Sequence, residues 1–236
     1  MDTPLILFED NHVLVAVKPA GILSQSDITK DADMLSILKR YLVETYHKPG
    51  DAYVGLLHRL DRPVSGVMVF AKTSKCASRI SAQIRQHQMV KRYRTVVWGG
   101  PLEEEGTLRS FIHKDEDRNQ VTVMHLDKGA AIPDHAKEGI LTYRCVGRAM
   151  RKGPVGNQPI SLLEVQLLTG RSHQIRAQLA DSGMPIMGDR KYGSDDPTYR
   201  GEICLEAFSL TFAHPISGME MNFTIPVSSK DPWNHF

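Results

Sequence analysis

Apolar and polar residues alternate along much of the chain, and this period of two is typical of half-buried strands. Two short apolar runs at 5–8 and 13–17 flank a polar turn, which predicts an opening hairpin. Alternation predicts strands at 90–98 and 161–168, and an unbroken apolar run predicts a buried strand at 67–71. Shorter strand-like segments occur at 107–112, 120–124 and 141–146, and two last strands are expected at 203–212 and 221–227. We expect the pieces between 106 and 148 to form a peripheral β region, with a mobile loop at 129–139.

Helical spacing of apolar residues is confined to a few segments. We expect helices at 33–46, from 73 or 74 to about 87, and at 171–181. Thr73 or Ser74 can cap the second helix, and Ile175 and Leu179 lie on one face of the third. Few strands alternate with helices, as βαβ units would require. The sequence therefore predicts an α+β fold with a mixed, largely antiparallel sheet.

The composition favours a single domain spanning 1–236, because 236 residues with 41% hydrophobic content can bury one large core. Cys76, Cys145 and Cys204 lie far apart and have the spacing of neither a zinc site nor a disulfide framework. With no leader-like or spanning segment at the start, a reduced, cytoplasmic protein is expected. No HExxH or CxxC motif appears, so we expect no metal.

Charge is unevenly distributed, although the formal net charge is only +2. No acidic residue occurs between Asp61 and Glu103, an interval that contains Arg62, Lys72, Lys75, Arg79, Arg85, Lys91, Arg92 and Arg94. One interpretation is a solvated face neutralised by the acidic runs at 103–105 or 115–117. The other is a surface that binds phosphate groups.

Asp61 stands in the segment HRLDRPVSG at 58–66, between basic residues and just ahead of an apolar run. A carboxylate can act as a nucleophile when cationic neighbours keep it ionised and a fixed backbone aims it. Arg59 and Arg62 supply the charge, and Pro63 and Gly66 restrict or shape the backbone. The alternative is that Asp61 only forms the turn, as many Asp residues do.

The segment HRLDRPVSG resembles the active-site motif of RluA-type RNA pseudouridine synthases. Four other stretches match that family in the same order: VLVAVKPAG at 13–21, KRY at 91–93, LTGRSHQIR at 168–176 with GDR at 188–190, and LEAFSLTFAHP at 205–215. The resemblance covers nearly the whole chain. It implies a mixed sheet with an RNA-binding cleft that isomerises uridine without cofactor or metal. Many members begin with an S4-like module; here we expect none, since matching residues begin almost at Met1.

The resemblance also implies roles for individual residues. Asp61 is the nucleophile, attacking C1′ of the ribose or C6 of the ring, or promoting elimination at the ribose. Tyr93 lies against the uracil plane and helps remove the C5 proton, and Arg176 pairs with the catalytic carboxylate. Leu205 packs beneath the target base. Without the motifs, Tyr93 would be an ordinary strand tyrosine and Arg176 a surface arginine on an amphipathic helix.

Contacts with RNA are expected from the basic residues of the same motifs, namely Arg59, Arg62, Lys91, Arg92 and Arg171. The target uridine must leave its stack, and Arg59 is suited to fill the gap because its planar guanidinium stacks on bases. His58 is expected to be a structural hydrogen-bonding residue. Val64 and Glu206 depart from the family pattern, which commonly has Thr and His there.

Two competing functions stay open. A non-catalytic RNA-binding protein would use the same basic surface but would not need Asp61, Tyr93 and Arg176 together. A nucleoside or glycoside hydrolase would use Asp61 as nucleophile but generally needs a second carboxylate, and none is near in the sequence. We expect a monomeric enzyme acting on structured RNA, ribosomal RNA first and transfer RNA second.

Overall fold

The structure is a computed structural model that describes residues 3–29, 31–125, 131–153, 156–193 and 199–236. It divides into two compact units: unit 1 comprises Met1–Lys91 and Ala207–Pro226, and unit 2 comprises Arg92–Glu206 and Val227–Phe236. Helices and strands occur in an α+β arrangement, so the predicted fold class is confirmed. The expectation of a single domain stays a prediction.

Unit 1 is built on a sheet in which β2 lies between β1 and β4, and β10 lies between β4 and β11. Its strands are β1 Ile6–Glu9, β2 Val13–Lys18, β3 Gly55–Leu56, β4 Ser65–Ala71, β10 Leu205–Ala213 and β11 Glu220–Thr224. The β1–β2, β2–β4, β3–β4 and β10–β11 ladders are antiparallel. The predicted opening hairpin is confirmed, while β3, with only two residues, was too short to predict.

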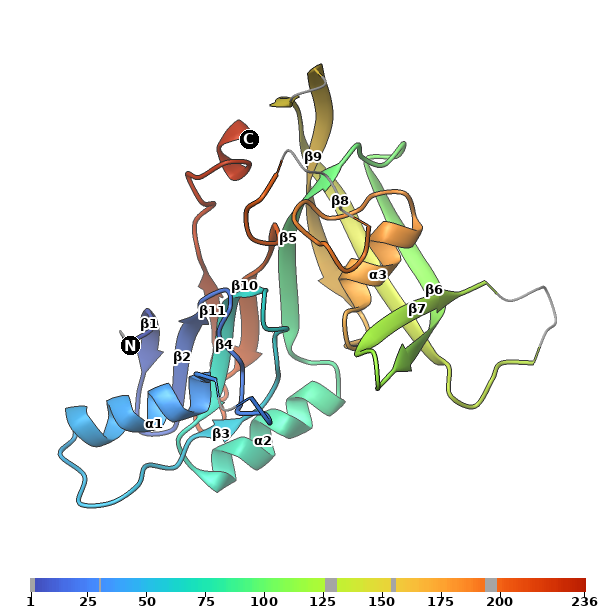
Figure 1. The fold of residues 1–236 in the computed structure, drawn as a ribbon. Coiled ribbons are helices and arrows are strands. Elements are labelled where there is room, and N and C mark those ends of the chain that lie inside the picture. Colours follow the sequence, from blue (N-terminus) through green and yellow to red (C-terminus); the bar gives the residue numbers. More distant parts are fainter. Residues whose placement is uncertain (1–2, 30, 126–130, 154–155, 194–198) are drawn as a thin grey trace. The chain divides into compact units, whose positions relative to one another are not determined.

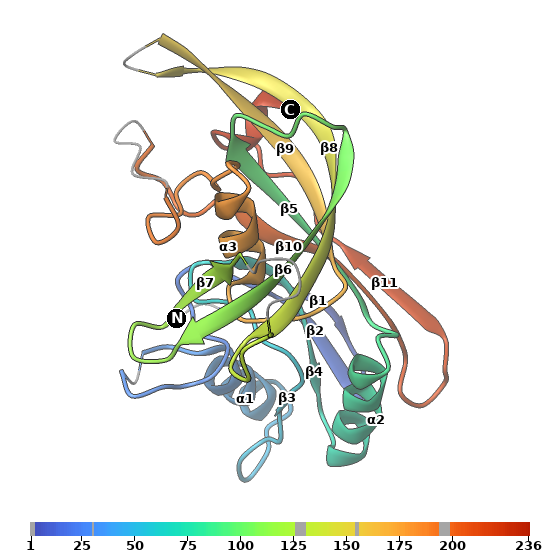
Figure 2. The same ribbon diagram turned by 90° about the vertical axis from the view of Figure 1, so that its right-hand side faces the viewer.

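Two helices belong to unit 1, α1 Met34–Thr45 and α2 Ser74–Arg85. Each begins where a side chain accepts a hydrogen bond from a free backbone N–H: Asp33 caps α1 and Thr73 caps α2. Figures 1 and 2 show the two helices on opposite sides of the strands. The strands alternate accordingly, and one face, with Val15 and Val69, packs in the same cluster as Ile80 of α2.

Unit 2 contains an antiparallel sheet in the order β5-β9-β8-β6-β7. Its strands are β5 Val90–Trp98, β6 Glu105–Asp115, β7 Gln120–Met124, β8 Lys137–Gly153 and β9 Gly156–Leu167, and β5 begins in unit 1. Helix α3, Gln174–Asp181, contacts β6 and β7 and lies on the concave side of the β8–β9 hairpin (Figure 2). A short 3-10 helix, η1 Trp233–His235, lies near the end of the chain.

The structure departs from the sequence prediction in three places. Strand β8 extends beyond 141–146 at both ends and β9 begins well before 161, because the two pair with each other into a long hairpin whose outer part lacks an alternating pattern. Helix α3 begins at Gln174 instead of Arg171, since His173 adopts a left-handed φ of 49°. In the predicted mobile loop, 129–130 lie outside the described residues and 137–139 belong to β8. Among the described residues, no helix is long and apolar enough to cross a membrane.

Candidate active site

The predicted site residues are distributed over both units. Unit 1 contains Arg59, Asp61, Arg62 and Lys91, and unit 2 contains Arg92, Tyr93, Arg171, Arg176 and Leu205. The predicted pairing of Asp61 with Arg176 stays a prediction, as does the RNA-binding cleft.

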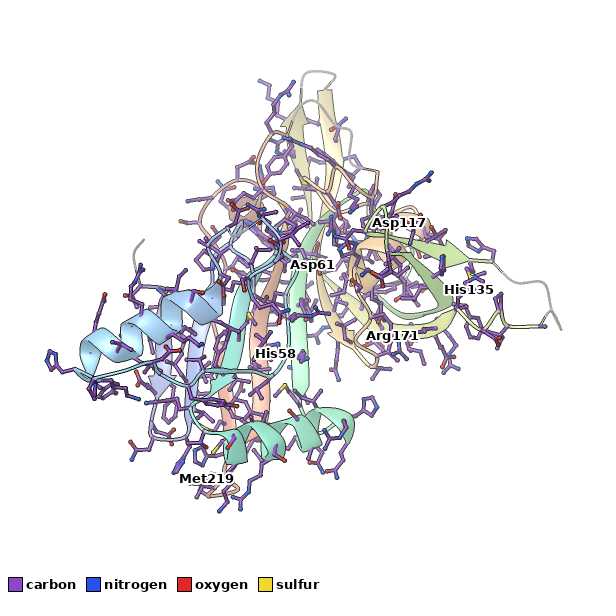
Figure 3. All side chains as sticks on the ribbon, turned by 60° about the horizontal axis from the view of Figure 1, so that its bottom comes forward. His58, Asp61, Asp117, His135, Arg171 and Met219 are labelled. Carbon is purple, nitrogen blue, oxygen red and sulfur yellow. The ribbon has the colours of Figure 1, made fainter. Side chains whose placement is uncertain are left out.

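Asp61 lies in a tight turn on the segment that joins β3 to β4 (Figure 3). Its carbonyl oxygen accepts a hydrogen bond from Val64 N–H at 3.0 Å, which closes the turn. Gly66 then enters β4 with a φ of 137°, and a Cβ there would lie 2.4 Å from the carbonyl oxygen of Ala207. Only glycine fits this close approach of β4 and β10, so Gly66 fixes the start of β4 directly after the turn.

The residue after Asp61 is held through its backbone by the 18–24 loop that follows β2. The carbonyl oxygen of Arg62 accepts hydrogen bonds from Gly21 N–H at 2.8 Å and from Lys18 Nζ at 3.0 Å. Lys18 is fully buried and also donates to the carbonyl oxygens of Pro19 at 3.0 Å and Ile22 at 2.6 Å. A buried ammonium requires such partners. Lys18 thus ties the 18–24 loop to the Asp61 turn, within one residue of the carboxylate.

The residue before Asp61 is held by the same loop. The hydroxyl of Ser24 donates to the carbonyl oxygen of Leu60 at 2.8 Å and accepts from Leu60 N–H at 3.1 Å. Ser24 and Leu60 are both buried, with 5% and 7% of their surface exposed. Neither Lys18 nor Ser24 was predicted as a site residue. Lys18 stands in the quoted VLVAVKPAG motif, whereas no sequence signal pointed to Ser24.

His58 fixes the start of the same segment. Its Nε2 accepts a hydrogen bond from Val69 N–H at 3.2 Å, beyond the point where β3 stops pairing with β4. Burial, together with the charge of Lys91, holds the pKa of His58 well below its usual value of 6.5. The imidazole is therefore neutral at neutral pH, and its structural role is confirmed. Its Nδ1 is buried without a hydrogen-bond partner among the described residues.

The cations of unit 1 differ in their surroundings. Arg59 is exposed, while Arg62 pairs with Asp31 at 2.9 Å and donates from Nε to the carbonyl oxygen of Gly21. Burial lowers the pKa of Lys91 from its ordinary value. The positive charge of Arg62 is thus partly balanced by the carboxylate of Asp31 within unit 1.

Arg176 is buried in unit 2, so its interpretation as a surface arginine is wrong. Its Nε and Nη2 donate to the two carboxylate oxygens of Asp189 at 2.7 and 2.8 Å, and both residues are almost inaccessible to solvent. The guanidinium also lies 5.1 Å from the ring centroid of Tyr192. Two-point pairing with a carboxylate fixes the plane of an arginine. Asp189 was not predicted in this role, although it belongs to the quoted GDR stretch.

The other predicted residues of unit 2 divide by exposure. Tyr93 and Leu205 are buried, whereas Arg92 is exposed, and the roles predicted for all three stay predictions. Arg171 precedes α3 instead of lying within it, and its Nε donates to the carbonyl oxygen of Glu138 at 3.1 Å. Its exposed side chain is labelled in Figure 3.

Glu206, which stands where the family commonly has histidine, has a defined partner. Its carboxylate accepts hydrogen bonds from Arg94, from Nε at 2.8 Å and from Nη2. Arg94 is 4% exposed and lies 5.9 Å from the ring centroid of Trp233. The departure at position 206 is therefore accommodated by an ion pair with Arg94.

The interval between Asp61 and Glu103, whose charged side chains are all basic, is partly neutralised by acidic residues elsewhere in the chain. Lys72 pairs with Glu9 at 2.6 Å, and Arg94 and Arg62 pair with Glu206 and Asp31. These partners lie outside both acidic runs that one interpretation of the sequence named as the source of neutralising charge. Exposed cations persist on α2, which contains no acidic residue, at Lys75, Arg79 and Arg85.

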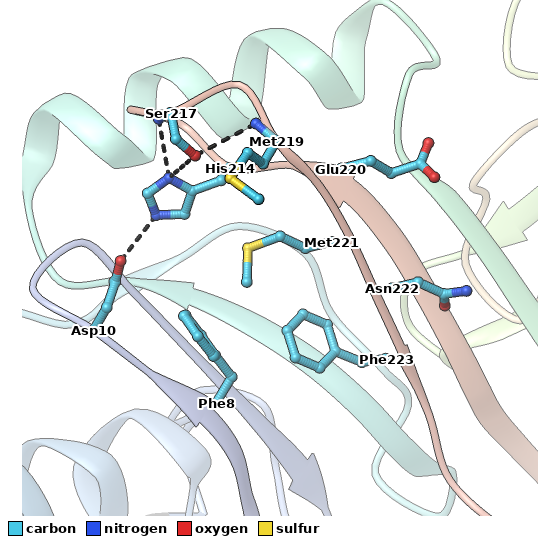
Figure 4. A pocket seen from close by; sticks show the side chains of 9 residues that line it. All are labelled: Phe8, Asp10, His214, Ser217, Met219, Glu220, Met221, Asn222 and Phe223. Atoms are coloured by element: carbon cyan, nitrogen blue, oxygen red, sulfur yellow. Dashed lines mark hydrogen bonds and ion pairs between the residues drawn. The ribbon is translucent and has the colours of Figure 1, made fainter.

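Unit 1 also holds a pocket of about 410 Å³ that none of the predicted site residues line (Figure 4). Its wall is mostly apolar, with Phe8 and Phe223 in ring contact at 5.9 Å. At its polar end, His214 Nε2 lies 2.9 Å from a carboxylate oxygen of Asp10. This pair joins the β1–β2 turn to the β10–β11 turn. In the described part of the chain, no three His, Cys, Asp or Glu side chains gather as a metal site would require.

The sequence matches the family model described as RNA pseudouridylate synthase over residues 12–181. The match spans most of the chain and includes Asp61, Tyr93 and Arg176. The chain belongs to this family. RNA pseudouridine synthases are isomerases, and the RluA-type resemblance is confirmed by relatives that bear that name.

A tRNA pseudouridine synthase C from Vibrio parahaemolyticus is 30% identical over 97% of this chain and 91% of its own length. A dual-specificity RNA pseudouridine synthase RluA from Haemophilus influenzae is 28% identical over 92% of this chain and 90% of its own. Among solved structures, human RNA pseudouridylate synthase domain containing 4 has the same fold, with a TM-score of 0.74 at 22% identity over 94% of this chain and 88% of that one.

Proposed function

We propose that this protein converts specific uridines of structured RNA to pseudouridine, with Asp61 as nucleophile and with Tyr93 and Arg176 as its catalytic partners. The family match supports the reaction. The observation that carries the choice of Asp61 is the turn in which it lies, because the backbones of Leu60 and Arg62 on either side are held by the buried side chains of Ser24 and Lys18. A carboxylate so anchored can be aimed at one atom of a bound nucleotide.

The reaction breaks the bond between C1′ and N1, turns the base, and joins C1′ to C5. The C5 proton leaves and N1 gains a proton, so the product is an isomer of the substrate and no cofactor is required. Asp61 acts at C1′, at C6, or by promoting elimination at the ribose. Tyr93 lies against the uracil and assists removal of the C5 proton. Arg176, oriented by Asp189, stabilises the ionised carboxylate of Asp61.

RNA binding is assigned to cationic side chains and to extrusion of the target base. Arg59 is exposed next to the Asp61 turn and fills the gap that the extruded uridine leaves. Arg62, Lys91, Arg92 and Arg171 contact the RNA, and Leu205 packs beneath the uracil. The exposed cations of α2 add attraction for the phosphate backbone. We further propose that the protein acts in the cytoplasm as a monomer.

The substrate is proposed to be ribosomal RNA or transfer RNA. Relatives named after tRNA, after the large ribosomal subunit and after dual specificity support both classes. Sequence-specific recognition of RNA relies on loop shape and splayed bases. The position of the modified uridine therefore has to be measured.

The test is to incubate the purified protein with total RNA from a strain that lacks it, and to map pseudouridines by chemical-stop sequencing. Asp61→Asn is treated in parallel. New stops with the wild type that are absent with Asp61→Asn are the expected result, and their positions identify the substrate. Stops that persist with Asp61→Asn would exclude Asp61 as nucleophile. Tight RNA binding without any stops would instead favour a non-catalytic RNA-binding protein.

A further inference from the structure

The backbone N–H and C=O groups of Leu60 lie outside the strands of the sheet and need hydrogen-bond partners from elsewhere. The residue is 7% exposed, and it lies in the segment after β3 has ended and before β4 begins. Buried backbone N–H and C=O groups need partners, which strands or helices normally supply. Here a single hydroxyl supplies both, since Ser24 Oγ lies 2.8 Å from Leu60 O and 3.1 Å from Leu60 N. Ser24 thus takes the place of a neighbouring strand at the residue before Asp61.

Ser24 is itself held firmly. Leu23 forms a parallel bridge with Asp33, through hydrogen bonds from Leu23 N–H to Ala32 O at 3.2 Å and from Met34 N–H to Leu23 O at 2.9 Å. Asp33 is the N-cap of α1, so this bridge attaches the loop to the first turn of a helix. On its other side, Ser24 Oγ lies 3.9 Å from the sulfur of Met68 in β4. The hydroxyl is therefore fixed between a helix start and a buried strand.

We propose that Ser24 is a positioning residue for catalysis, whose hydroxyl sets the backbone at Leu60 and through it the direction of the Asp61 carboxylate. The inference rests on the proposed function, because it requires Asp61 to be the nucleophile. Lys18 holds the other side of the turn through Arg62 O, so loss of the Ser24 hydroxyl frees one side only. The turn then persists with a displaced carboxylate. A displacement of about 1 Å in a reacting group is sufficient for a rate loss of about 100-fold.

Thr and Val at position 24 form a matched pair of variants. They have the same shape and the same added bulk, and only Thr retains a hydroxyl, so their difference isolates the two hydrogen bonds to Leu60. Ser24→Ala is the direct deletion. Ser26→Ala is the control, because Ser26 lies two residues further along the chain and is exposed.

The assay measures tritium released to water from RNA labelled at C5 of uridine, using total RNA from a strain that lacks the protein. Single-turnover rate constants with enzyme in excess report the chemistry of the folded molecules, while misfolding lowers the amplitude. We expect Ser24→Ala and Ser24→Val to lower the rate constant by about 10- to 100-fold. Ser24→Thr is expected to react several-fold faster than Ser24→Val, and Ser26→Ala to match the wild type.

Equal rate constants for Ser24→Thr and Ser24→Val would overturn the inference, as would a loss confined to the amplitude. Asp61→Asn is measured alongside them. If Asp61→Asn is inactive while Ser24→Val reacts at the wild-type rate, only the role of Ser24 is refuted. If Asp61→Asn retains the wild-type rate, the proposed nucleophile itself is refuted.

Discussion

The buried ion pair of unit 2 leads to a prediction for Asp189→Asn. The carboxylate accepts two hydrogen bonds from Arg176, at 2.7 and 2.8 Å, and one from Lys191 N–H at 3.1 Å. Its side chain is 1% exposed and that of Arg176 is 7% exposed. Asparagine keeps the shape but removes the charge and turns an N–H₂ group toward a guanidinium. Removing one partner of a buried ion pair costs about 3–5 kcal/mol of the free energy of unfolding.

Urea unfolding followed by circular dichroism measures this loss. With a slope of about 2.5 kcal/mol per molar urea, the midpoint of Asp189→Asn falls by about 1–2 M. The matched control is Glu138→Gln, which breaks the ion pair with Arg109 at 3.2 Å in the same unit. The side chains of Arg109 and Glu138 are 67% and 40% exposed, so the control loses at most about 1 kcal/mol. A midpoint for Asp189→Asn no lower than that of the control would show that the buried charge is not held by Asp189.

A double replacement separates stability from catalysis. Arg176→Met combined with Asp189→Leu removes both charges of this ion pair, so much of the stability lost in Asp189→Asn returns. If Arg176 is catalytic, pseudouridine formation stays absent in this variant. Recovery of both stability and activity would contradict the role proposed for Arg176.

Two further predictions concern the frame around Asp61. Gly66→Ala places a Cβ at a φ of 137° and 2.4 Å from a backbone oxygen, so we expect the free energy of unfolding to fall by at least about 2 kcal/mol. The control is Gly50→Ala, where a Cβ would lie in open space; it is expected to change the free energy of unfolding by less than about 0.5 kcal/mol. Equal thermal unfolding of the two variants would contradict this reasoning. The pKa of His58 is lowered in the folded state, so the unfolded chain binds more protons below its usual value of 6.5, and stability falls with falling pH there by up to about 1.4 kcal/mol per pH unit. Replacing His58 by Asn should flatten that part of the stability curve, and an unchanged slope would assign it to other groups.

Much of the fold could be predicted from the order of residue types. Two apolar runs around a polar turn identified the opening hairpin, period-two alternation identified β5, and side chains with capping ability marked the start of α2 at Thr73. The family motifs also named Asp61 and Arg176 as site residues. These signals are local, since periodicity, caps and motifs are each written into consecutive residues.

The tertiary structure decided which distant groups meet. Ser24 and Leu60 are 36 residues apart, and Lys18 and Arg62 are 44 apart, yet each pair shares a hydrogen bond. Periodicity reports which side of an element is buried, but a buried polar group is satisfied by whatever the folded chain brings within about 3 Å of it. For that reason the sequence by itself determined most of the elements and named Asp61 as the predicted nucleophile, while only the three-dimensional packing revealed how the backbone on either side of this carboxylate is held.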